Sequence, residues 1–281
     1  MQLTVLVDNN TFIDKYYRGE PAVSYFLEAD GQRVLFDLGY SGLFIENARK
    51  MGIDLLDVDL VVLSHGHLDH TWGILSFIRM STEAAFEGRT VKRPRLVAHP
   101  DVLRRKRHRD IPEIGLPLTE DSLAGYFDLR LSREPVRLTE RLTFLGEIER
   151  RNAFEAQETI GTVAEGATER EDDLRDDTAL AYGSGEGLVV ITGCAHAGIC
   201  NVVEYARRTC GERRIADIVG GFHLLAPSRE RLEATIRYLE SVAPRRVHAG
   251  HCTDLKSRTE MARSLPLEEL GVGLRLEYPG G

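Results

Sequence analysis

The sequence has few cysteines, no long apolar run and a shortage of positive charge. Its 281 residues include four cysteines, all in the last third of the chain, and this number does not make a disulfide scaffold. No apolar run approaches the roughly 18 residues that a membrane-spanning helix needs, and no basic leader segment precedes the first apolar run. We therefore expect a cytoplasmic protein with no membrane partner.

The charge balance narrows the range of partners further. The chain has 36 Lys and Arg against 44 Asp and Glu, a formal net charge of −8. Affinity for nucleic acid comes largely from neutralising phosphates with basic side chains, so we expect no nucleic-acid partner. A small anion needs only a few local cations, so a small-molecule substrate is the expected partner. The sequence leaves the oligomeric state open.

Apolar and charged residues are present in ordinary globular proportions, at 42% and 28%. No repeat and no linker rich in Pro, Gly or Ser divides the chain, so we predict one domain over residues 1–281. Short apolar runs predict strands at 3–7, 23–29, 33–36, 60–63, 95–98, 187–192, 216–219 and 246–249. Helical spacing predicts helices at 44–51, 198–209, 228–241 and 256–265. This mixture predicts an α/β fold.

Two charged segments do not fit this pattern of apolar runs. The basic run at 104–109 is interpreted as one solvated face of a helix, with attraction of phosphates towards a pocket as the alternative. Residues 164–177 are strongly charged and lack apolar periodicity. We expect them to form a mobile surface loop.

The strongest functional signal is the run His-Gly-His-Leu-Asp-His at positions 65–70, which follows the apolar run 60–63 almost directly. An extended strand end lets His65 and His67 point the same way, so that they can bind one metal ion. Asp69 and His70 can reach a second ion nearby. Neutral imidazole and carboxylate groups are the ligands expected for Zn²⁺, Mn²⁺ or Fe²⁺.

This run, His-x-His-x-Asp-His after an apolar strand, resembles the signature of the metallo-β-lactamase superfamily. The run Leu-Phe-Asp-Leu-Gly at 35–39 is similar to the early strand and turn of that superfamily. Segments 192–199, 220–224 and 251–253 resemble the subgroup described as dihydropterin (ribofuranosyl)aminobenzene phosphate synthase-like. The resemblance covers nearly the whole chain. It implies a four-layer αβ/βα sandwich with the metals at the edge where two sheets meet.

The resemblance also implies where the remaining metal ligands lie. His196, just past the predicted strand 187–192, would complete the first metal site with His65 and His67. His251, beyond the predicted strand 246–249, would join Asp69 and His70 at the second site. The cofactors implied are two divalent metal ions, with zinc preferred and manganese or iron as alternatives.

The sequence departs from the common superfamily pattern in one respect. Most members have a ligand histidine in a Gly-His-x-x-Gly turn and a bridging aspartate at the end of the next strand. Between His70 and His196 the only histidines are His99 and His108, neither in such a turn, and the strand ends in Gly-Cys. Three explanations stay open: His196 replaces the usual ligand, Cys194 takes the bridging position as a thiolate, or the site lacks a protein bridge.

Other polar residues at strand ends have weaker signals. His223 follows a Gly-Gly pair and is a candidate for leaving-group or oxyanion catalysis, for metal binding, or for simple packing. Asp37 is suited to accept an N–H from a ligand histidine and fix its tautomer. His248 is expected to be structural, and His99 to reach the site only as a less favoured alternative.

The preferred functional hypothesis is a binuclear metal-dependent hydrolase in which Asp69 orients the nucleophilic water and His223 assists the leaving group. Resemblance to the subgroup favours phosphate or pyrophosphate esters as substrates. A mono-iron oxidoreductase similar to sulfur dioxygenases is the alternative enzyme class. A metal-stabilised binding protein without turnover is a third hypothesis, which the intact run of ligands disfavours.

Overall fold

The computed structural model describes residues 1–156 and 158–280, and their strands form two large sheets and one small one. The first large sheet has the strand order β16-β1-β2-β3-β4-β5-β7. Its strands, in chain order, are β1 Gln2–Val7, β2 Ser24–Ala29, β3 Gln32–Phe36, β4 Leu60–Val62, β5 Arg95–Ala98, β7 Asp128–Leu131 and β16 Arg275–Glu277. The four strands from β3 to β7 in this order are mutually parallel.

The second large sheet has the strand order β15-β14-β13-β12-β9-β8. Its strands, in chain order, are β8 Val136–Arg137, β9 Leu142–Phe144, β12 Ala179–Ser184, β13 Gly187–Thr192, β14 Ile215–Gly221 and β15 Arg246–Gly250. Strands β13, β14 and β15 are parallel. The small sheet joins β6 Lys106–Arg107 to the hairpin of β10 Thr162–Glu165 and β11 Thr168–Glu171.

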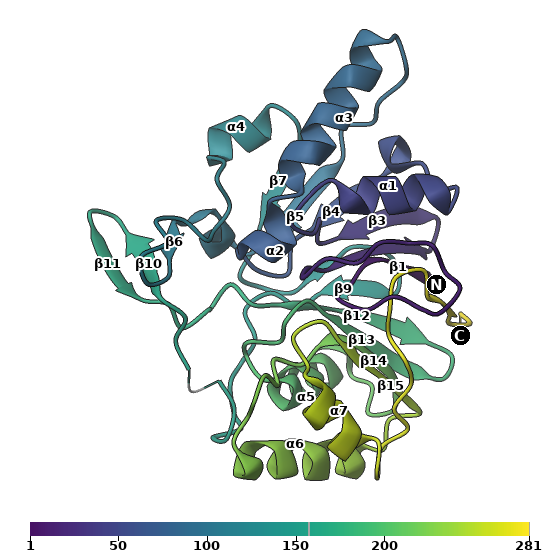
Figure 1. Ribbon diagram of the computed structural model, residues 1–281, viewed down its shortest axis with the longest axis vertical. Helices are drawn as coiled ribbons and strands as arrows, with labels where there is room; N and C mark the ends of the chain where they lie inside the picture. Colours follow the sequence, from purple (N-terminus) through teal and green to yellow (C-terminus); the bar gives the residue numbers. More distant parts are fainter. Residues whose placement is uncertain (157, 281) are drawn as a thin grey trace.

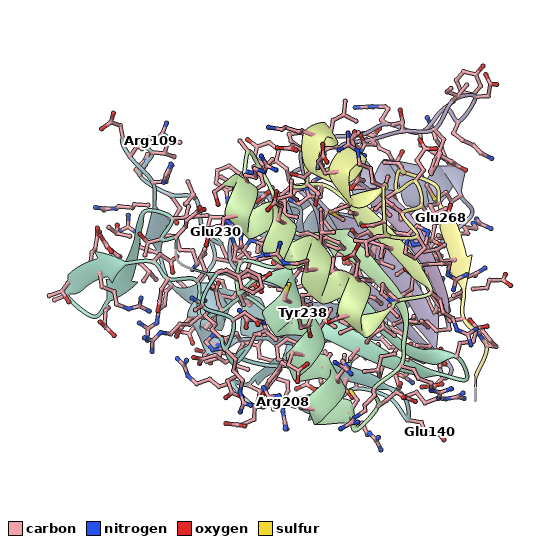
Figure 2. All side chains as sticks on the ribbon, turned by 90° about the horizontal axis from the view of Figure 1, so that it is seen from below. Arg109, Glu140, Arg208, Glu230, Tyr238 and Glu268 are labelled. Atoms are coloured by element: carbon pink, nitrogen blue, oxygen red, sulfur yellow. The ribbon has the colours of Figure 1, made fainter. Side chains whose placement is uncertain are left out.

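Helices cover the outer face of each large sheet, so that the molecule has four layers (Figure 1). The helices are α1 Leu43–Lys50, α2 Leu68–Thr71, α3 Ile74–Phe86, α4 Glu120–Ala124, α5 Ile199–Cys210, α6 Arg229–Val242 and α7 Leu255–Met261. Figure 2 shows α5 and α6 lying across the second sheet. The molecule has three apolar cores. One lies between the two sheets, and each sheet has one more between its outer face and its helices. The predicted αβ/βα sandwich is confirmed.

The parallel strands of the two sheets end at one shared edge of the sandwich. The strand β4 is buried along its whole length and leads directly into residues 64–70, here called the histidine loop. Strands β13, β14 and β15 lead into residues 193–198, 222–223 and 251–252. Because side chains at the carboxyl ends of neighbouring parallel strands converge, the chemistry-bearing segments of both halves meet here.

Most predicted strands and helices are present with shifts of one or two residues at their ends. Ser228 caps α6 by accepting the backbone N–H of Arg231 at 3.2 Å. Helix α7 is shorter than predicted and ends at Met261. No helix in residues 1–156 and 158–280 is long and apolar enough to cross a membrane.

Both charged segments were predicted wrongly. The basic run does not form a helix: a short 3₁₀ turn, Pro100–Leu103, precedes it, and Lys106–Arg107 form strand β6. Residues 164–177 are not a loop, because they contain most of the β10–β11 hairpin and then several buried aspartates. The reason is that the charges of the two segments pair with one another. Arg107, for example, contacts Glu169 at 2.9 Å across the small sheet.

Candidate metal centre

Three histidines from the two sheets meet at the shared edge. His65 and His67 follow β4, whereas His196 follows β13. Their ring centroids lie 4.7 Å apart for His65 and His67, 4.7 Å for His65 and His196, and 5.0 Å for His67 and His196. All three side chains are buried. The structure therefore brings together the three residues that were predicted for the first metal site.

Several nitrogen atoms of this cluster have no hydrogen-bond partner among the described residues: Nε2 of His67 and both ring nitrogens of His196. An unpaired buried polar atom costs about 1–3 kcal/mol, so such atoms indicate a ligand. Burial lowers the pKa of His67 to about 4 and holds the pKa values of His65 and His196 well below the usual value. Neutral imidazoles with free lone pairs fit a divalent transition metal.

A second group of potential ligands lies beside the first and consists of Asp69, His70, Cys194 and His251. Nε2 of His70 is 3.3 Å from Sγ of Cys194 and 3.5 Å from Oδ2 of Asp69. Nε2 of His251 lies 3.4 Å from the same Asp69 oxygen. The ligand atoms of all four residues lie within 4.8 Å of one another. Carboxylate, imidazole and thiol groups in this arrangement suit a second divalent ion.

Cys194 lies between the two groups of ligands. Its sulfur is also within 4.8 Å of ligand nitrogens of His65 and His196, and burial raises the pKa of its thiol well above the usual value. Binding a metal would therefore release the thiol proton. The positions of Cys194 and His196 are compatible with two of the explanations that the sequence leaves open, a thiolate ligand at Cys194 and a replacement ligand at His196.

Asp37, at the end of β3, holds His70 in position. Its Oδ2 accepts hydrogen bonds from Nδ1 of His70 and from the Ser64 hydroxyl, both at 2.6 Å, while Oδ1 accepts the Ser64 backbone N–H at 2.7 Å. Burial alone would lower the pKa of His70, but the Asp69 and Asp37 carboxylates raise it well above the usual value. Because Nδ1 is engaged, Nε2 is the nitrogen that faces Asp69 and Cys194. The hydrogen bond predicted between Asp37 and a candidate ligand histidine is therefore present.

His251 has a comparable support that the sequence analysis missed. Oδ2 of the buried Asp8 accepts the His251 backbone N–H at 3.0 Å. Nδ1 of His251 lies 3.1 Å from Oδ1 of Asn9, so Nε2 is directed towards Asp69. The available signal was an aspartate directly after the apolar strand β1, in the same position relative to its strand as Asp37 relative to β3.

His223 and Cys252 extend the site on the side of His196. The rings of His196 and His223 lie 4.2 Å apart, and Nδ1 of His223 has no partner among the described residues. The His223 backbone N–H donates to Sγ of Cys252 at 3.2 Å. Burial alone would lower the pKa of His223, but Cys252 raises it. His223, Cys194 and Cys252 each offer a ligand atom within 4.8 Å of the others, so the position of His223 fits both predicted alternatives, catalysis and metal binding. Cys252 was not among the predicted site residues, although it directly follows the predicted ligand His251 at the end of a strand.

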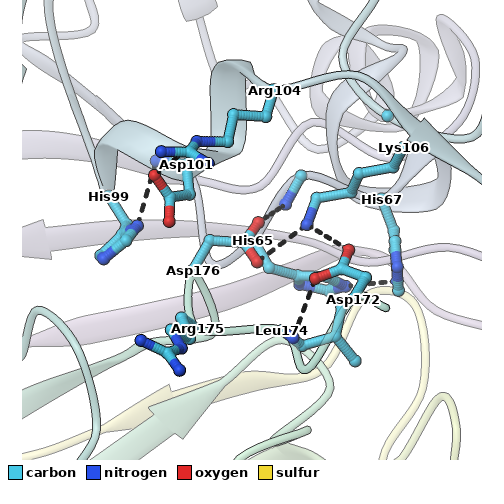
Figure 3. Close-up of polar contacts among 12 residues, drawn as sticks. His65, His67, His99, Asp101, Arg104, Lys106, Asp172, Leu174, Arg175 and Asp176 are labelled. Atoms are coloured by element: carbon cyan, nitrogen blue, oxygen red, sulfur yellow. Dashed lines mark hydrogen bonds and ion pairs between the residues drawn. The ribbon is translucent and has the colours of Figure 1, made fainter. Parts of the chain in front are cut away.

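A buried lysine supports the histidine loop from the side of the small sheet (Figure 3). Nζ of Lys106 lies 2.6 Å from Oδ2 of Asp172 and 3.0 Å from Oδ1 of Asp176. Asp176 also accepts the backbone N–H of Gly66 at 2.8 Å. Burial would raise the pKa of Asp176, but Lys106 holds it below the usual value. The two charged segments whose structure was mispredicted therefore jointly fix the backbone between His65 and His67.

Two other buried histidines lie outside both groups of ligands. Nδ1 of His99 accepts the Asp101 backbone N–H at 3.1 Å and caps a 3₁₀ turn. Nδ1 of His248 lies 2.9 Å from Oδ1 of Asp217, so the structural role predicted for His248 is confirmed.

A small cleft lies beside the site on the side of His196 and His223. Its lining is formed by Ala156, Glu158, Ile160, Leu174, His196, His223 and Arg231. Arg231 comes from the first turn of α6. The cleft therefore combines two histidines of the candidate centre with one cation.

The comparisons with known proteins agree with this geometry. A family model described as the metallo-beta-lactamase superfamily matches residues 17–210. A curated relative from Methanocaldococcus jannaschii, named 7,8-dihydropterin-6-methyl-4-(beta-D-ribofuranosyl)-aminobenzene-5'-phosphate synthase, is 28% identical over 273 residues. That match covers 92% of this chain and 89% of the relative.

Solved structures show the same fold. A metal-dependent hydrolase of the beta-lactamase superfamily aligns with a TM-score of 0.83 and 28% identity, over 99% of both chains. A diphosphatase from the PhnP family aligns with a TM-score of 0.52 and 17% identity, over 99% of this chain and 97% of that one. At that level of identity the likeness to the diphosphatase concerns the fold alone.

Proposed function

Because the chain belongs to the metallo-β-lactamase superfamily, we propose that it is a binuclear metal-dependent hydrolase of small phosphate or pyrophosphate esters. The observation that carries the proposal is the set of adjacent groups of potential ligands that share Cys194, one with His65 and His196 and another with Asp69, His70 and His251. The hydrolase that aligns over 99% of this chain supports the reaction class. The proposed partner is a small molecule rather than a nucleic acid or a membrane.

In this proposal each ligand group holds one divalent ion. His65, His67 and His196 would hold the first, and Asp69, His70 and His251 would hold the second. Thiolate and imidazole ligands favour zinc, and manganese and iron are the alternatives. Bound ions of this kind supply a hydroxide near neutral pH and polarise the scissile bond.

Asp69 is the residue that orients the attacking water. Burial alone would raise the pKa of its carboxyl group, but His70 and His251 hold that pKa well below the usual value. The group is therefore an ionised acceptor at neutral pH. Its position between two imidazoles, at 3.5 and 3.4 Å, fixes the direction in which its oxygens point.

His223 is the residue that donates a proton to the leaving group. Its Nδ1 has no partner among the described residues, and it lines the cleft beside His196. A raised pKa keeps more of this imidazole in the protonated form that a general acid needs near neutral pH. The leaving oxygen would then depart as an alcohol or a protonated phosphate.

The name of the curated relative supports the substrate class. It describes a compound with a 5'-phosphate on a ribofuranosyl group joined to an aminobenzene. We propose that the substrate of this chain is likewise a phosphorylated compound. It would carry its phosphate on one part of the molecule and a pterin-like or other aromatic ring on another.

The test begins with elemental analysis of freshly purified, untagged protein, followed by a panel of phosphodiester, pyrophosphate, lactone and thioester substrates. We expect about two zinc or manganese ions per chain and metal-dependent hydrolysis of the phosphorylated substrates. His67→Ala should lose metal and activity together, whereas the matched control His108→Ala, outside both ligand groups, should lose neither.

Two results would contradict the proposal. About one iron per chain, with oxygen uptake on a sulfur compound, would identify the oxidoreductase alternative instead. Tight metal binding without turnover on any substrate of the panel would identify a binding protein.

A further inference from the structure

We propose that Arg231 binds a phosphoryl oxygen of the substrate and thereby gives the cleft its preference for anionic esters. The inference rests on the proposed function, because the bound phosphoryl group is the one presented to the metal centre. Three observations support it: the guanidinium of Arg231 lines the cleft, some of its N–H donors have no partner among the described residues, and the neighbouring His196 and His223 have ring nitrogens without a partner there.

Arg231 is held at the cleft by the start of α6. Its backbone N–H is capped by Ser228 at 3.2 Å, so its place in the first helical turn is fixed. In Figure 2 this turn, marked by Glu230, lies towards the end of the molecule that carries β10 and β11. The partial positive charge of a helix N-terminus adds to that of the guanidinium.

The guanidinium of Arg231 is only partly used within the protein. The side chain is 14% exposed, Nη2 donates to the His223 carbonyl oxygen at 3.2 Å, and Nη1 lies 3.4 Å from Oε1 of Glu158. Nε is buried and has no partner among the described residues. Glu158 is 69% exposed, and an ion pair with so exposed a carboxylate contributes little. A guanidinium offers five N–H donors, so several remain available for a ligand.

The buried Glu155 interacts with Arg231 only through space: burial raises the pKa of its carboxyl group, and the charge of Arg231 opposes that rise. Glu155 accepts the backbone N–H groups of Cys200 and Asn201, both at 3.0 Å, and thus caps the first turn of α5. Its two oxygens are committed to those donors. The direct ion pair of Arg231 is with the exposed Glu158, which an incoming anion can displace.

Three of the residues that line this cleft carry buried polar atoms with no partner among the described residues. These atoms are both ring nitrogens of His196, Nδ1 of His223 and Nε of Arg231. A phosphoryl group has enough oxygens to contact the metal centre through one and a planar guanidinium through another. A neutral carboxylic ester has no second anionic oxygen to offer. The arrangement therefore selects phosphodiesters and pyrophosphates over neutral esters.

The test measures binding of inorganic phosphate to the metal-loaded protein by titration calorimetry, with the metal content verified before and after. Replacing Arg231 by glutamine should weaken phosphate binding by about 10- to 100-fold, the size expected for lost hydrogen bonds to a charged group. Arg231→Lys should recover a large part of the affinity, because lysine keeps the positive charge. Recovery should be incomplete, because lysine lacks the planar guanidinium that donates to the His223 carbonyl oxygen. Arg229→Gln is the matched control on the same helical turn and should bind phosphate as the unmodified chain does.

The outcomes separate this inference from the proposed function. Equal phosphate affinity in Arg231→Gln and the unmodified chain, or no phosphate binding at all, would overturn the role of Arg231. Failure of Arg231→Lys to recover any affinity would show that the residue only holds the His223 segment. Phosphate binding that depends on Arg231, in a protein without hydrolytic turnover, would overturn the proposed function and leave the anion site standing.

Discussion

Replacing Lys106 with methionine tests the support of the histidine loop. Methionine fills a similar volume without the charge, so the change removes the only cation that contacts both Asp172 and Asp176 among the described residues. Both carboxylates are almost completely buried. Removing one partner of a buried ion pair costs about 3–5 kcal/mol, because the other charge stays buried without compensation.

This loss is large enough to measure in the metal-free protein. At about 2–4 °C per kcal/mol for a chain of this size, the thermal midpoint should fall by roughly 6–20 °C. Urea denaturation at neutral pH gives the free energy of unfolding directly. The matched control is Lys92→Met, because Lys92 contacts Asp57 at 2.6 Å and Asp59 at 2.9 Å but is 45% exposed. Exposed pairs of this kind contribute about 0–1 kcal/mol.

A second variant distinguishes lost charge pairing from lost packing. Adding Asp172→Asn and Asp176→Asn to Lys106→Met removes the uncompensated charges, while the amide oxygens still accept the backbone N–H groups of Leu174 and Gly66. We expect the triple variant to regain most of the lost stability. The reasoning is refuted if Lys106→Met costs no more than Lys92→Met, or if the triple variant is no more stable than the single one.

Asp37→Asn should weaken metal binding at the group that contains His70 by about 10- to 100-fold, because the carboxylate fixes which nitrogen of His70 faces the site; competition with a chromophoric chelator measures this, and an unchanged affinity would contradict it. Gly193→Ala should lower metal content, because a Cβ there would overlap the Ser64 side chain and lie 2.8 Å from Oδ2 of Asp37. Gly125→Ala, whose Cβ would meet only one carbonyl oxygen at 3.4 Å, is its control and should leave metal content unchanged. Removal of metal with a chelator should lower the thermal midpoint, and added zinc should restore it in proportion to the logarithm of its concentration; a midpoint indifferent to both treatments would argue against a bound metal.

The histidine loop could be predicted from sequence because its signal is local. An apolar run followed by alternating histidines fixes both the strand and the side to which His65 and His67 point. His196 and His251 could be placed only with the help of a family resemblance, since each stands alone after its strand. The structure then brings both to the same edge because β13 and β15 run parallel.

The support around the site could not be predicted because its partners are distant in the chain. Lys106 is 66 residues from Asp172 and 70 from Asp176, and nothing in either segment indicates that the other neutralises it. Charged residues without apolar periodicity are usually solvated, so each segment by itself favoured exposure. The same applies to Cys194 and Cys252, whose meeting depends on how β13 and β15 align.

The candidate ligands come from both halves of the sandwich, and this division has a consequence for how the protein matures. The histidine loop follows a strand of the first sheet, while His196 and His251 follow strands of the second. Neither half can assemble a complete set of donors before the two sheets have docked, so binding of the proposed metals would come late in folding. Once bound, the ions would cross-link the histidine loop to residues that follow β13 and β15. Such a link closes a long loop of chain, as a disulfide does in other proteins. Separation of the two sheets would then require release of the metal ions. Because the ions would bind after the sheets dock, they would slow unfolding more than they speed folding.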